Sequence, residues 1–87
     1  MKINVTLKDI LFGIRTSREN CPISLAVRRT IPDKYIATNV DNIDISYASI
    51  SLPQRAVKFI DAFDNKQFFN PAILPFSFEL NFTEESK

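Results

Sequence analysis

Hydrophobic and polar residues alternate strictly over residues 74–82, near the end of the chain. A period of two is typical of a β-strand with one face in the core and the other in water. Because Pro75 cannot donate a hydrogen bond to a neighbouring strand, we expect it at the start of the strand or on an edge. The pattern therefore predicts a half-buried strand that closes the core. Its apolar face would comprise Leu74, Phe76, Phe78, Leu80 and Phe82.

Two segments, residues 22–30 and 53–64, carry apolar side chains at helical spacing. Each begins with proline, whose fixed backbone angle suits the first helical position. We expect Asn65 to end the second helix in the left-handed conformation, while Pro32 prevents the first from continuing. The predicted buried stripes are Ile23, Ala26, Val27 and Ile31 in the first helix, and Ala56, Val57, Phe59, Ile60 and Phe63 in the second.

Shorter patterns predict the remaining elements. Residues 2–6 alternate like a strand, and a short helix follows from Thr6 through Phe12. Residues 35–40 and 43–50 predict a hairpin, whose second strand changes its apolar phase before Ile50. That change of phase predicts a bulge or a bend near residues 48–49.

The predicted order is β-α-α-β-β-α-β. It favours an α+β domain of two layers, a four-stranded antiparallel or mixed sheet with helices on one face. A length of 87 residues corresponds to one domain, and a hydrophobic fraction of 45% with eight phenylalanines suffices for its core. We expect residues 83–87 to form a frayed tail.

The composition removes most routes to catalysis. The chain contains no histidine, one cysteine and one glycine, so histidine-dependent triads, histidine-ligated metals and glycine-rich phosphate loops are excluded. Cys21 at a helix start could be a nucleophile, but packing is the favoured interpretation. Asp61, Asp64 and Glu79 could form a carboxylate cluster, but a solvated face is favoured. We expect no enzymatic activity, no metal and no cofactor.

The apolar runs and the single cysteine indicate the compartment. Residues 1–7 are too short and too polar for the apolar core of a signal peptide, and no apolar run reaches the roughly 20 residues that span a bilayer. A single cysteine agrees with a reducing environment. We therefore expect a cytoplasmic protein without membrane association.

The loop before the first long helix is the main candidate binding site, because guanidiniums and hydroxyls there precede a helix start that can hold an anion. Residues 15–34 hold five cations against two carboxylates, whereas residues 59–87 hold two cations against five carboxylates. Alternatively, the arginines complement the helix dipole and the loop is merely solvated. The net charge of +1 argues against general binding of duplex nucleic acid. The candidate residues are Arg15, Thr16, Ser17, Arg18, Asn20, Arg28 and Arg29.

Three motifs resemble a group of small uncharacterised proteins from phages and bacteria. They are CPISLA at residues 21–26, LP at 52–53 followed by FIDAFD at 59–64, and PFSF at 75–78. The chain differs from the group by Asn65-Lys66 at a usual glycine and by a longer insertion at residues 67–73. The group has no assigned activity. The resemblance implies a small accessory protein of a phage or a mobile element.

The favoured function is therefore a non-enzymatic binding protein, an accessory or anti-defence protein of a phage or mobile element. It would occupy a host macromolecule or sequester a small ligand, including an anionic one. The alternative is a weak nucleic-acid or nucleotide binder that uses Arg15, Arg18, Arg28 and Arg29. Strands at sheet edges would leave backbone groups for a second copy, so we also expect a homo-oligomer, most simply a dimer.

Overall fold

The chain forms an α+β fold in a computed structural model that describes residues 1–32 and 34–81. This fold class is the one predicted, with one strand more than expected in the order. The elements are β1 (Lys2–Val5), α1 (Leu7–Phe12), α2 (Pro22–Thr30), β2 (Ile36–Thr38), β3 (Asn42–Ile45), β4 (Ala48–Ser51), α3 (Gln54–Asp64), the 3-10 helix η1 (Pro71–Ile73) and β5 (Phe76–Glu79). No helix among these residues is long and apolar enough to span a bilayer.

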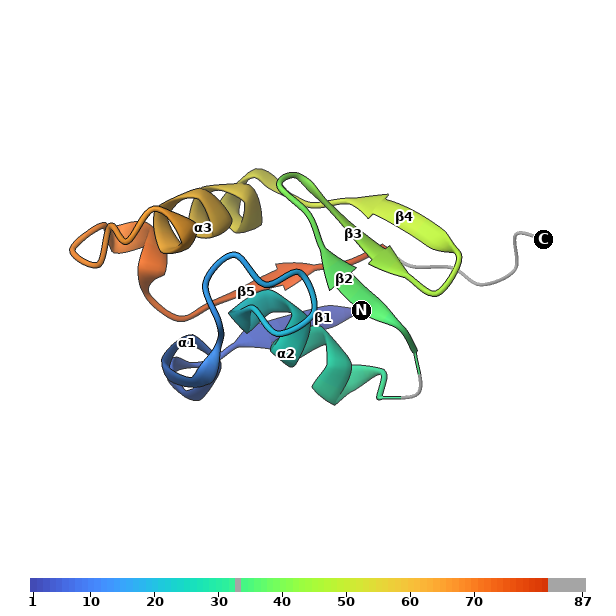
Figure 1. The fold of residues 1–87 in the computed structure, drawn as a ribbon. Helices are drawn as coiled ribbons and strands as arrows, with labels where there is room; N and C mark the ends of the chain where they lie inside the picture. The colour runs from blue at the N-terminus through green and yellow to red at the C-terminus, as the bar shows by residue number, and fades with distance from the viewer. Residues whose placement is uncertain (33, 82–87) are drawn as a thin grey trace.

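The described strands form two antiparallel sheets instead of the single four-stranded sheet that was predicted (Figure 1). The first and last described strands meet in the first sheet, where β1 pairs with β5 and Ile3 lies opposite Phe78. The second sheet has the order β2-β3-β4, and Ile43 lies opposite Ile50. The pairing of β1 with β5 closes the core because it places the buried side chains of both strands on one face of the sheet.

The predicted strand at residues 43–50 is a hairpin in its own right. The chain reverses between β3 and β4 at Ser46 and Tyr47, and Ser46 has a left-handed backbone with φ of 55°. Ile50 changes phase because of this reversal, so the predicted bulge or bend at residues 48–49 was wrong. A serine carries the conformation that glycine usually supplies in such turns, and the sequence therefore lacked the turn signal.

The closing strand is shorter than the alternating pattern. Pro75 immediately precedes β5, as predicted, and Phe78 and Leu80 are buried. Leu74 is 63% exposed because it follows η1 and lies outside the sheet, so its place in the core was predicted wrongly. The predicted position of Phe82 and the frayed tail at residues 83–87 lie outside the described residues.

The helices follow their sequence signals closely. The bounds of α2 are those predicted, with Cys21 at the N-cap. Helix α3 starts one residue later than predicted because Pro53 is its N-cap. Asn65 has φ of −97°, and the left-handed residue is Lys66 with φ of 60°, so the predicted left-handed stop was wrong by one position.

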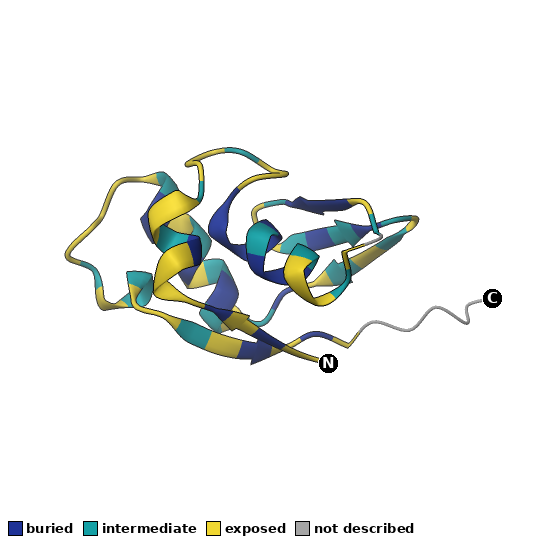
Figure 2. Ribbon diagram, turned by 90° about the horizontal axis from the view of Figure 1, so that it is seen from below, coloured by how far each residue is buried: buried dark blue, intermediate teal, exposed yellow. Residues whose placement is uncertain are grey.

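The core lies where both sheets meet α2 and α3. Phe59 is at its centre, 5.5 Å from the ring of Phe63 and 5.2 Å from that of Phe76 between centroids. Figure 2 shows buried residues toward the middle of the molecule and exposed ones on the outer sides of helices and loops. The buried apolar side chains are Ile3, Val5, Cys21, Ile23, Ala26, Val27, Ile36, Ala37, Ile43, Ile45, Leu52, Ala56, Phe59, Ala62, Phe63, Phe78 and Leu80.

Candidate functional site

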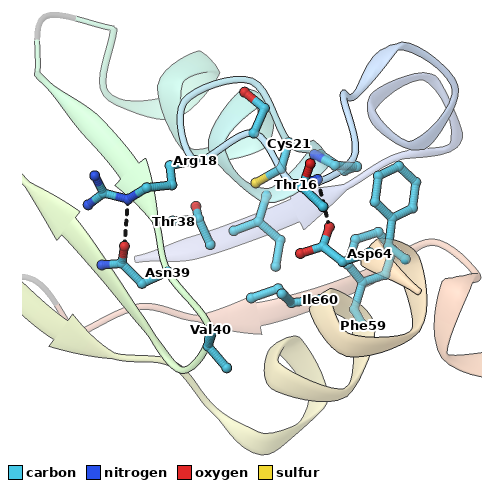
Figure 3. Close-up of a pocket in the computed structure, with 13 residues that line it drawn as sticks. Thr16, Arg18, Cys21, Thr38, Asn39, Val40, Phe59, Ile60 and Asp64 are labelled. Atoms are coloured by element: carbon cyan, nitrogen blue, oxygen red, sulfur yellow. Dashed lines mark hydrogen bonds between the residues drawn. The ribbon is translucent and has the colours of Figure 1, made fainter. Parts of the chain in front are cut away.

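A pocket of about 270 Å³ opens where the loop before α2 faces the end of α3 (Figure 3). Its walls come from three segments that are distant in the sequence: the loop with the start of α2 that follows it, the end of β2 with the residues after it, and α3. The apolar part comprises Cys21, Pro22, Ile23, Val40, Phe59, Ile60 and Phe63, and the polar part Thr16, Ser17, Arg18, Thr38, Asn39 and Asp64. Apolar walls with a few polar groups are typical of small-molecule sites.

A buried polar junction fixes the loop at one side of the pocket. The carbonyl of Arg18 accepts hydrogen bonds from Ser24 Oγ at 2.6 Å and from the amide of Thr38 at 2.8 Å. The hydroxyls of Ser24 and Thr38 are also within 2.7 Å of each other. Both side chains are buried, so these bonds form away from water. The loop is thereby attached to both α2 and β2.

The Arg18 side chain is held by two acceptors from the β2–β3 region. Its Nε donates to Asn39 Oδ1 at 2.7 Å, and its Nη2 lies 3.1 Å from Asp44 Oδ2. Asn39 Nδ2 donates to the same Asp44 oxygen at 3.2 Å. The positive charge of Arg18 is therefore balanced within the protein.

Asp64 connects the last turn of α3 to the opposite side of the pocket. Its Oδ1 accepts a hydrogen bond from the amide of Thr16 at 3.0 Å. Thr16 can present this amide because its backbone is left-handed, with φ of 61°. No cation lies within ion-pair distance of Asp64 among residues 1–32 and 34–81. The carboxylate of Asp64 is thus oriented by an amide but not neutralised.

The predicted binding residues do not gather into one site. Thr16, Ser17 and Arg18 line the pocket, while Arg15 is exposed beside it and outside the lining. The Ser17 hydroxyl accepts a hydrogen bond from the Asn20 amide at 3.1 Å, which stabilises the turn of the loop. Three residues of the loop, Thr16, Ser17 and Arg18, therefore form part of the pocket wall.

The other predicted residues lie elsewhere. Asn20 and Arg28 line a second, polar pocket of about 290 Å³ with Glu19, Lys34, Tyr35 and Ile36. Arg28 donates to the carbonyl of Glu19. Arg29 forms an ion pair with Asp9, 2.7 Å from Nη1 to Oδ1, at neither pocket. Arg28 and Arg29 thus make internal contacts.

The remaining reactive candidates are dispersed. Cys21 is buried on the pocket wall, with Sγ 3.6 Å from Ser24 Oγ. Glu79 binds the amino terminus at 3.1 Å, and Asp61 accepts a hydrogen bond from the Asn65 side chain. The part of the chain that the structure describes contains no group of three or more cysteines and carboxylates suited to a metal ion.

Sequence reasoning missed the α3 side of the pocket. Phe59, Ile60 and Phe63 follow the helical stripe of a core helix, and Asp64 follows the pattern of a solvated helix end. No local signal distinguishes a stripe that is fully covered from one that borders a cavity. The hydrogen bond between Thr16 and Asp64, which lie 48 residues apart in the sequence, places the loop opposite the end of α3, so that this stripe borders the pocket.

Comparison of the chain with protein-family models, with curated proteins and with solved structures found no match.

Proposed function

We propose that the protein is a small non-enzymatic binding protein that takes up a compact ligand in the pocket between the loop and α3. One observation carries the proposal: three distant segments form a largely apolar pocket whose polar groups are already held by internal hydrogen bonds. A preorganised site loses little conformational entropy when a ligand binds. The volume is near the lower end of small-molecule sites, which suits a ligand of roughly ten to fifteen non-hydrogen atoms.

The biological setting is proposed from the resemblance of its three motifs to small phage and bacterial proteins. In that setting the protein would act in the cytoplasm of the host cell as an accessory or anti-defence protein. A pocket that sequesters a small molecule fits this role more directly than a surface that occupies a macromolecule. The single cysteine, buried at Cys21, is compatible with a reducing compartment.

The alternative, a nucleic-acid or nucleotide binder, is less well supported. Arg18 is paired with Asp44, Arg28 with the Glu19 carbonyl, and Arg29 with Asp9. A phosphate chain would compete with these internal acceptors for the same guanidiniums. Such binding would weaken steeply with added salt, whereas an apolar pocket would respond little.

A homodimer is also proposed. Apolar side chains on and just after α1 are more than half exposed, and a contiguous apolar patch often marks a contact surface. The β4 edge, which pairs only with β3 among the described strands, is a second surface for another copy. The exposed side chains near α1 are Leu7, Leu11, Phe12 and Ile14.

Binding to the pocket can be tested with 2-phenylethanol, a compact neutral probe with an apolar ring. We expect saturable shifts of the Thr16, Val40 and Asp64 amide signals in NMR spectra, with affinity in the millimolar range, as a ligand efficiency of about 0.3 kcal/mol per atom implies for so small a probe. Ile60→Trp should fill the pocket and abolish the shifts. Lys58→Trp, at an exposed position of the same helix, should leave them unchanged. Shifts scattered over the surface, or none, would contradict the proposal.

A further inference from the structure

We infer that the ligand of this pocket is a neutral or singly positive molecule with a compact apolar body and an amino group that donates to Asp64, and that anions are disfavoured. This inference rests on the proposed function, because it assigns a chemistry to the same pocket. It differs from the anion site that the arginines of the loop suggest in the sequence.

The balance of charge around the pocket decides against an anion. Arg18 is the only cation of the pocket lining, and Asp44 lies 3.1 Å from its Nη2. The Nε of Arg18 donates a hydrogen bond to Asn39 Oδ1. Asp64 has no cation within ion-pair distance among the described residues, so the charge of the lining that lacks a partner is negative.

The start of α2 favours an anion, but its effect is weaker than that of the Asp64 carboxylate. Cys21 and Pro22 bring the helix N-terminus to the pocket wall, where the helix dipole corresponds to about half a positive charge. Proline also removes one of the free amides that could donate to an anion. A full carboxylate at Asp64 outweighs this partial charge, so a ligand carboxylate or phosphate would meet net repulsion.

The geometry of Asp64 favours a donor on the ligand. The Thr16 amide takes Oδ1 and thereby fixes the orientation of the carboxylate, which leaves Oδ2 as an acceptor. Figure 3 shows Asp64 on the side of the pocket opposite Arg18 and Asn39, with Ile60 between these two sides. An ionised carboxylate only accepts hydrogen bonds, and it forms its strongest ones with positively charged donors.

The apolar wall defines the rest of the molecule. Phe59 and Phe63 stand nearly parallel, with 11° between ring planes, and Ile60 lies half-buried on the same helix. Val40, 75% exposed, faces the pocket from beyond β2. A flat or branched hydrocarbon body placed here would cover Val40 and Ile60, while its amino group reached Asp64.

Three probes with the same ring and different charge separate these possibilities: 2-phenylethylamine, 2-phenylethanol and 3-phenylpropionate. In NMR titrations at low salt and neutral pH, we expect the amine to bind about two- to fivefold more tightly than the alcohol, and the acid to bind most weakly. Asp64→Asn should remove the preference for the amine. Asp61→Asn, the same change at an exposed position of α3, should preserve it.

The outcomes distinguish the two proposals. If the alcohol and the amine bind equally, or if the acid binds most tightly, the inference about ligand charge is wrong while the pocket remains a binding site. If none of the three probes causes saturable shifts at Thr16, Val40 and Asp64, the proposed function itself is wrong. If Asp64→Asn unfolds the protein, Asp64→Ser, which removes the charge with a smaller side chain, serves in its place, and retained preference for the amine would overturn the inference.

Discussion

Arg29 donates two parallel hydrogen bonds to the buried carboxylate of Asp9, with Nη1–Oδ1 at 2.7 Å and Nη2–Oδ2 at 2.9 Å. The same guanidinium donates to the carbonyl of Asn4 at 2.9 Å, and the Thr6 amide donates to Asp9 Oδ2 at 2.9 Å. One cation in the last turn of α2 thus joins β1 and the capping box of α1. Arg29, which was expected to complement the helix dipole, therefore connects α2 to β1 and to α1.

Removing this arginine should destabilise the fold. Arg29→Ala leaves the Asp9 carboxylate, whose side chain is 5% exposed, without a cation. Because Arg29 itself is half exposed, we expect a loss of about 2 kcal/mol in the free energy of unfolding, below the range for a fully buried pair. Arg29→Lys should lose less, because lysine keeps the charge but not the paired geometry. Urea denaturation provides the measurement, and an unchanged midpoint for Arg29→Ala would contradict the prediction.

The ion pair also predicts a pH dependence. Burial alone raises the pKa of Asp9, but the hydrogen bonds from Arg29 and Thr6 outweigh burial and hold the pKa below its ordinary value. The unfolded chain then binds the proton more readily, so the stabilisation is complete above about pH 5 and is lost as the pH falls below about 4. The difference in unfolding free energy between the wild type and Asp9→Asn should shrink over that range. A difference that stays constant from about pH 6 to about pH 3 would contradict this assignment.

Two phenylalanines, one buried and one exposed, test which side chains form the core. Phe78 is 7% exposed on β5, whereas Phe69 is fully exposed in the segment after α3. Phe78→Ala should cost roughly 3–5 kcal/mol in unfolding free energy, because it leaves a cavity in the buried core. Phe69→Ala should change stability by less than about 0.5 kcal/mol. Thermal and urea unfolding compare the two, and equal effects would refute the assignment of the core face.

The junction beneath the loop gives a fourth prediction. Ser24 is fully buried, and its hydroxyl contacts the Arg18 carbonyl and the Thr38 hydroxyl. Ser24→Ala should cost about 1–3 kcal/mol because it removes a partner from buried polar groups. Hydrogen exchange at Thr38 should accelerate. Ser51→Ala, at an exposed position of β4, is the matched control and should be nearly neutral.

Self-association gives the last prediction. At tens of micromolar, light scattering should report the mass of two chains. Leu11→Gln should weaken the dimer, because Leu11 is 70% exposed on α1. Phe69→Gln, at an exposed apolar side chain in the segment after α3, should not affect it. A mass of one chain for the wild type would rule out the dimer at that concentration.

Local patterns determined the elements. The bounds of α2 follow from the proline at its start and the apolar spacing of Ile23, Ala26 and Val27. The buried faces of β1 and β5 follow from alternation, because successive side chains of a strand point to opposite sides. Backbone sterics and side-chain periodicity act within a few residues, so a sequence displays them directly.

Tertiary structure decided how these elements combine and where the pocket lies. The separation into two sheets depends on the pairing of β1 with β5 across almost the whole chain. The candidate site depends on Thr16 meeting Asp64 and on Asp44 neutralising Arg18. These contacts join a backbone amide to a carboxylate 48 residues away and a guanidinium to a carboxylate 26 residues away. The sequence lists their donors and acceptors but not their pairing, because pairing is set by the packing of the whole core.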